Sequence, residues 1–110
     1  MDNINIINSL KSYNNIIERR KNNYFLIYIT SNKFTSLDNI FSNLIENLSE
    51  TNNLIFLKID VDNNSELVSH LDITSYPVFR IYKNNINLKE ISGTYTDIET
   101  ILKNIIDLNL

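Results

Sequence analysis

Few side chains in this sequence could take part in catalysis, and none of them is a thiol. The 110 residues include no cysteine and a single histidine, His70. Ser31, Thr35 and Ser36 offer hydroxyls within one polar stretch, but such a hydroxyl becomes a nucleophile only beside a base. His70 lies on a different predicted element. Because thiol–disulfide exchange needs a thiolate, the sequence predicts neither hydroxyl nor thiol catalysis.

Two carboxylates, those of Asp60 and Asp62, could form a cation site. Only Val61 separates them, so both point to the same side of a strand end. Even with Asn63 or Asn64 they fall short of the six to eight oxygens that calcium binds. We therefore expect no metal ion and no other cofactor.

Charge argues against nucleic acid as a partner. The formal net charge is -3 and the isoelectric point is about 5.0, which gives no electrostatic reason to bind a phosphate backbone. Arg19-Arg20-Lys21 is the densest basic run. We interpret it as a solvated helix end, where cations suit the helix dipole, rather than as a recognition patch.

The composition predicts one ordered domain over residues 1–110. The chain is 43% hydrophobic and 21% charged, with one glycine and one proline, and its length suffices for a single core. The N-terminus lacks the basic and apolar regions of a secretory signal. No stretch approaches the roughly 18 apolar residues of a membrane span. We expect a cytoplasmic protein without membrane contact.

Hydrophobic periodicity predicts alternating strands and helices in the first half of the chain. Residues 3–7 alternate as a short edge strand, and residues 9–20 have helical spacing. Residues 24–29 form a continuous aromatic and β-branched run, as in a strand buried on both faces. An apolar stripe from Leu37 to Leu48 predicts the second helix, with Thr35 or Ser36 as its N-cap.

The second half is predicted to contain a strand, a short helix and two further strands, over residues 54–59, 67–71, 78–82 and 86–91. Lys83-Asn84-Asn85 separates the last two strands, which is too short for a crossover helix and right for an antiparallel hairpin. Asparagine tolerates the positive φ of such turns. Thr96-Asp97-Ile98-Glu99 has the capping-box pattern that opens a final helix.

The segment around the only proline resembles the second half of a thioredoxin. Phe56-Leu57-Lys58-Ile59-Asp60-Val61-Asp62 precedes a short helical stretch, Ile73-Thr74-Ser75-Tyr76-Pro77, and a strand that ends in Lys83-Asn84-Asn85. The order of elements matches that family too, so the resemblance covers nearly the whole chain, although it is specific only between residues 56 and 93. It implies an α/β thioredoxin-like fold, β-α-β-α-β-α-β-β-α, with a central mixed sheet and helices on both faces.

The resemblance gives Pro77 and Gly93 specific places. Pro77 matches the family's cis-proline, whose loop presents its backbone to a bound peptide; the alternative is a trans proline that starts a strand. Gly93 falls where the family has a glycine that lines the same groove. The alternative for Gly93 is an ordinary turn at a strand end.

The resemblance also locates the chemistry that has been lost. The family's Cys-x-x-Cys falls on Phe34-Thr35-Ser36-Leu37, and the tryptophan before it falls on Lys33. The family's buried acidic residue aligns with Tyr28, and its helix-kinking proline aligns with Ser42. Because several parts of one catalytic device are absent together, we expect that the protein is not an enzyme.

The groove beside the former active site is the predicted binding site for a protein or an extended peptide segment. Its expected lining residues are Lys33, Phe34, Thr35, Ser36, Tyr76, Pro77 and Gly93. An exposed Phe34 would replace a reactive sulfur with an apolar anchor. The alternative is that Phe34 folds back on the domain.

Two other functions remain open from the sequence. The first is a structural subunit of a larger complex that binds through its outer helices or a sheet edge. The second is a thioredoxin acting as a protein-disulfide reductase in cell redox homeostasis, which homology alone would suggest and the absence of cysteine opposes. In the family layout His70 faces solvent, far from residues 31–36, which leaves the hydroxyls of that loop without a base.

Overall fold

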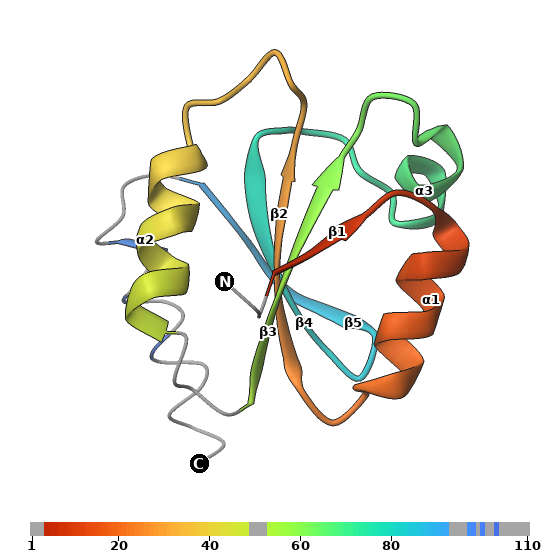
Figure 1. Cartoon of the computed structure of the whole chain (residues 1–110), viewed down its shortest axis with the longest axis horizontal. Coiled ribbons are helices and arrows are strands. Elements are labelled where there is room, and N and C mark those ends of the chain that lie inside the picture. Colours follow the sequence, from red (N-terminus) through yellow and green to blue (C-terminus); the bar gives the residue numbers. More distant parts are fainter. Residues whose placement is uncertain (1–3, 49–52, 93–96, 99, 101–102, 104–110) are drawn as a thin grey trace.

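The computed structural model of the protein has a five-stranded sheet with helices on both faces (Figure 1). The model describes residues 4–48, 53–92, 97–98, 100 and 103. The elements are β1 (Ile4–Ile7), α1 (Leu10–Arg19), β2 (Tyr24–Thr30), α2 (Asp38–Leu48), β3 (Leu54–Asp60), α3 (Ser65–His70), β4 (Val78–Lys83) and β5 (Ile86–Ile91). The predicted α/β thioredoxin-like fold is confirmed.

The sheet has the strand order β1-β3-β2-β4-β5 and mixed strand directions. β3 pairs in parallel with both β1 and β2, whereas β4 runs antiparallel to β2 and β5 antiparallel to β4. Figure 1 shows α2 on one face of the sheet and α1 with α3 on the other. All seven residues of β2 are buried, as its unbroken apolar run predicts for a strand covered on both faces.

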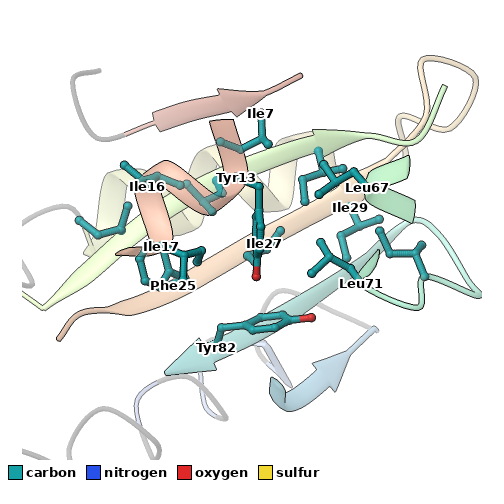
Figure 2. Packing of buried hydrophobic residues seen from close by; sticks show 14 of the residues in the cluster. Ile7, Tyr13, Ile16, Ile17, Phe25, Ile27, Ile29, Leu67, Leu71 and Tyr82 are labelled. Carbon is teal, nitrogen blue, oxygen red and sulfur yellow. The ribbon is translucent and has the colours of Figure 1, made fainter. Parts of the chain in front are cut away.

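Each face of the sheet has its own apolar core. On the α1 and α3 face, Tyr13, Ile16 and Ile17 of α1 and Leu67 of α3 pack against alternate residues of the strands (Figure 2). On the α2 face, the buried stripe of α2 packs against the intervening strand residues. Successive side chains of a strand point to opposite faces, so β2 and β3 contribute residues to both cores. The register of these two strands therefore determines which residues enter each core.

The hairpin of β4 and β5 turns at Asn84 and Asn85, as predicted. Both residues have positive φ, 54° and 61°, the combination that a two-residue type I′ turn requires. α1 begins after Ser9, whose hydroxyl accepts a hydrogen bond from the Ser12 amide at 3.1 Å and so satisfies one amide of the first turn.

Two predicted boundaries need comment. α2 begins at Asp38, later than a cap at Thr35 or Ser36 would give, because residues 36–37 form a turn instead. The predicted final helix falls mostly outside the described residues. In that segment the structure describes residues 97, 98, 100 and 103, and all four are helical. In the part of the chain that the structure describes, no helix combines the length and apolar character of a membrane span.

Candidate binding groove

Two loops that are distant in the sequence meet at a pair of exposed aromatic rings. Phe34 follows β2 and Tyr76 precedes β4, yet their ring centroids lie 5.7 Å apart with an interplanar angle of 60°. Phe34 is 46% exposed and Tyr76 is 43% exposed. Phe34 therefore does not fold back into the core, and the two rings form one aromatic surface, which we call the aromatic pair.

The other predicted groove residues surround the aromatic pair or continue its loops. Lys33, Thr35 and Ser36 are exposed beside Phe34, and Pro77, next to Tyr76, is half-buried. The Tyr76–Pro77 peptide bond is cis. Gly93 lies outside the described residues, so its place in the groove stays a prediction.

The loop of residues 31–37, here called the first loop, is a tight turn held by its own backbone. Ser31 and Phe34 form an isolated antiparallel bridge, in which the Phe34 amide donates to the Ser31 carbonyl at 2.9 Å. The Thr30 hydroxyl donates to the Phe34 carbonyl, and the Asp38 amide donates to the Thr35 carbonyl at 3.0 Å. Bonds at both ends of the loop thus fix the direction in which Phe34 leaves it.

Ser31 ties the first loop to the end of β3. Its hydroxyl is buried, donates to an Asp62 carboxylate oxygen at 2.7 Å and accepts from the Lys33 amide at 3.2 Å. The Asp62 amide in turn donates to the Asp60 carboxylate at 2.8 Å. Both carboxylates are thus used in local structure, and among the described residues no cluster of acidic or histidine side chains could hold a metal ion.

Tyr28 and Asp38 join the strand that precedes the first loop to the helix that follows it. The buried Tyr28 phenol donates to the Asp38 carboxylate at 2.5 Å, and its ring stacks on Phe79 with a centroid separation of 5.0 Å. Burial, followed by the bond to Asp38, raises the pKa of Tyr28 to about 12. Tyr28 is thus a neutral phenol whose carboxylate partner comes from α2.

Arg80 supports the loop of residues 72–77, here called the second loop. Its guanidinium is buried and donates to the Leu71 carbonyl at 2.6 Å and to the Asp72 carbonyl at 2.9 Å. It also donates to the Tyr82 hydroxyl at 3.0 Å and pairs with Glu90 at 2.8 Å. Burial alone would lower the pKa of Arg80, but the bonds to Glu90 and Tyr82 outweigh it and the pKa is raised. The residue is therefore a permanent cation that fixes the start of the second loop.

Sequence reasoning found the exposed surface of this site but missed its supports. Arg80 is a single charge inside the apolar strand Val-Phe-Arg-Ile-Tyr, a signal that could have indicated a buried ion pair, since an unpaired charge is not buried. His70 is exposed, and its ring meets the edge of the Tyr13 ring at 6.2 Å, in agreement with the predicted surface position. No signal in the sequence pointed to Ser31 and Asp62 as partners.

The fold and this site match one family of known proteins. The family model described as thioredoxin matches residues 6–107, and the chain belongs to the thioredoxin family. The chain has no cysteine.

Known relatives agree with this assignment. A thioredoxin of Ictalurus punctatus is 42% identical over 53 residues, which are 46% of this chain and 50% of the relative. One of Gallus gallus is 32% identical over 54 residues, 48% of this chain and 51% of the relative. The chain thus spans about half the length of these curated relatives in the matches.

Solved structures cover more of the chain at lower identity. The thioredoxin of Trypanosoma brucei brucei has a TM-score of 0.80 at 20% identity and covers 94% of this chain and 91% of its own. That of Fasciola hepatica has a TM-score of 0.77 at 19% identity, with 90% and 96% covered. These likenesses establish the thioredoxin fold.

Proposed function

We propose that this chain is a redox-inactive member of the thioredoxin family that binds protein partners, as extended segments, through the groove at Phe34 and Tyr76. The observation that carries the proposal is the exposed aromatic pair at the place of the missing thiols. Exposed aromatic side chains commonly supply the apolar anchor of an interface. The site has exchanged a reactive group for a contact surface.

The redox half of the proposal rests on the chemistry of exchange. A thiolate must attack a disulfide and a second thiol must resolve the mixed intermediate, and this sequence supplies neither. The Ser31 hydroxyl does not take over as a nucleophile, because Ser31 is only 2% exposed and a substrate cannot reach it. The purified protein should therefore not reduce insulin disulfides above background, and reproducible turnover by a contaminant-free preparation would contradict this.

The binding half rests on shape. Tyr76 lies in an exposed stretch before β4, where an extended segment can pair with the backbone as in strand addition, and Phe34 lies beside it to contact an apolar side chain. The exposed Lys33 adds a cation next to Phe34. Both loops are held by hydrogen bonds from buried side chains, those of Ser31 and Arg80, so little ordering entropy opposes binding.

Phe34→Asp tests the groove, with Leu88→Asp as its matched control. Phe34 and Leu88 are each 46% exposed, but Leu88 lies on β5 rather than in either loop of the groove. We expect Phe34→Asp to reduce the capture of partner proteins from cell lysate at least about tenfold, and Leu88→Asp to leave it unchanged. Melting temperatures should change little in both variants, because exposed positions tolerate polarity.

The other outcomes separate the alternatives. Equal capture by wild type and Phe34→Asp would move the binding surface away from the groove and favour a subunit that binds through its outer faces. A drop in melting temperature of many degrees in Phe34→Asp would show that the ring stabilises the fold, and the groove would lose its anchor.

A further inference from the structure

The edge of the sheet at β1 has an open backbone and hollows on both of its faces. Among the described residues, β1 pairs only with β3 and ends the sheet; Figure 1 shows it at the near edge, between the layer of α2 and the layer of α1. A terminal strand leaves amides and carbonyls without strand partners on its outer side, and natural proteins commonly block such edges with charged residues or proline. Ile4-Asn5-Ile6-Ile7 contains neither.

The two hollows lie on opposite sides of β1. One, of about 270 Å³, lies between β1 and α2 and has a mixed lining, with apolar residues such as Ile4, Ile6 and Phe41 and polar residues such as Asp38, Ser42 and Lys58. The other, of about 390 Å³, lies between β1 and α1 and is lined by the strand together with residues such as Ser12, Asn15 and Arg19. Side chains of an added strand point alternately to the two faces of a sheet, so such a strand would place side chains in both hollows.

The side chains of β1 differ between the two faces of the strand. Ile4 packs against the core on the α2 face, whereas Ile7 belongs to the core on the α1 face. By alternation, Ile6 shares the α2 face with Ile4, and Asn5 shares the α1 face with Ile7. Ile6 is 64% exposed, the largest exposure among the exposed large hydrophobic residues of the described chain. A fitting strand presents apolar side chains toward α2 and a polar amide toward α1.

We propose that β1 is a self-association edge, which pairs antiparallel with β1 of a second copy of this chain about a two-fold axis beside Asn5. In this register Ile6 of each copy lies opposite Ile4 of the other on the α2 face, since directly opposite residues of an antiparallel pair share a face. The two Asn5 amides meet on the α1 face, beside the polar side chains of Ser12 and Asn15. The surface is its own complement, as a two-fold interface requires.

The sequence of β1 favours a second copy over an unrelated strand. The occupant needs an isoleucine-like residue, a small polar residue and another apolar residue in alternation, which is the order Ile4-Asn5-Ile6 itself. The edge strand carries no charge that would repel its own copy at close range. The pairing would join two five-stranded sheets into one continuous sheet, with the groove of each copy set at β2 and β4, beyond β3.

Sedimentation equilibrium on the full chain tests the proposal, with Ile6→Asp and Ile86→Asp as a matched pair. Ile6 is 64% exposed on the β1 edge and Ile86 is 61% exposed on the opposite edge strand, β5. We expect a monomer–dimer equilibrium in wild type and in Ile86→Asp, and a dissociation constant at least about tenfold higher in Ile6→Asp. Hydrogen exchange should show concentration-dependent protection of the β1 amides in wild type and in Ile86→Asp but not in Ile6→Asp.

Three results would overturn the proposal. A wild-type protein that stays monomeric at millimolar concentration has no self-association edge, even if a foreign peptide strand binds there. Dimers lost in Ile86→Asp but kept in Ile6→Asp would place the contact at β5. A dimer whose β1 amides gain no protection would use another surface, and none of these results depends on partner capture by the groove.

Discussion

The two loops that meet at the aromatic pair are supported differently by side chains. The first loop is held by several separate hydrogen bonds, from Thr30, from Ser31 to Asp62 and from Tyr28 to Asp38. At the start of the second loop the side-chain support comes from Arg80, whose guanidinium donates to the carbonyls of Leu71 and Asp72. Backbone bonds from the Asp72 and Ile73 amides, at 3.2 and 3.0 Å, add to it. Side-chain support that is shared among several residues tolerates the loss of one partner better than support from one residue.

Among the substitutions that test this difference between the loops, replacement of Arg80 should lower the free energy of unfolding most. Arg80→Met leaves the Leu71 and Asp72 carbonyls without their donor, and buried groups left without partners cost about 1–3 kcal/mol each. We expect the free energy of unfolding in urea to fall by about 3 kcal/mol. Lys89→Met, which removes an exposed cation from the same hairpin, should change it by less than about 0.5 kcal/mol.

Alkaline pH should remove one support of the first loop. The folded-state pKa of Tyr28 is about 12, above its ordinary value of 10.0, so its contribution is complete below about pH 10 and is lost as the pH rises to about 12. Between about pH 10 and pH 12 the free energy of unfolding, measured in urea, should therefore fall by about 2 kcal/mol less in Tyr28→Phe than in wild type. Tyr76→Phe, which alters an exposed ring, should keep the wild-type slope; equal slopes in all three proteins would contradict the assignment.

Removal of one hydroxyl from the first loop should have the smallest effect. Ser31→Ala deletes the bonds to Asp62 and to the Lys33 amide but leaves the Thr30 and Asp38 contacts in place. We expect the free energy of unfolding to fall by about 1 kcal/mol and hydrogen exchange at the Lys33 amide to become faster. Ser36→Ala, at an exposed position of the same loop, should have no effect. If Ser31→Ala costs as much as Arg80→Met, the support of the first loop is not distributed.

The exposed half of the site was predictable from the sequence, and the buried half was not. Periodicity predicted the strands and helices, because apolar pattern and turn chemistry are local. The resemblance around Pro77 implied that Phe34 and Tyr76 lie near each other, as their ring contact shows. The partnership of Ser31 with Asp62 joins side chains 31 residues apart and depends on the exact register of β2 with β3. The start of α2 at Asp38 depends in the same way on contacts that hold the first loop, which helix propensity does not describe.

The turn at Asn84 and Asn85 has a consequence for the unfolded chain. Each residue adopts a positive φ that glycine would supply more readily, but glycine loses more backbone entropy on folding than any other residue. Two asparagines therefore begin from a narrower ensemble of conformations than two glycines would. The Asn85 side chain also accepts a hydrogen bond from the Tyr13 hydroxyl at 3.2 Å, a contact that glycine cannot make. A composition poor in glycine thus gives this hairpin a turn that closes at a lower entropic cost and is linked to the first helix.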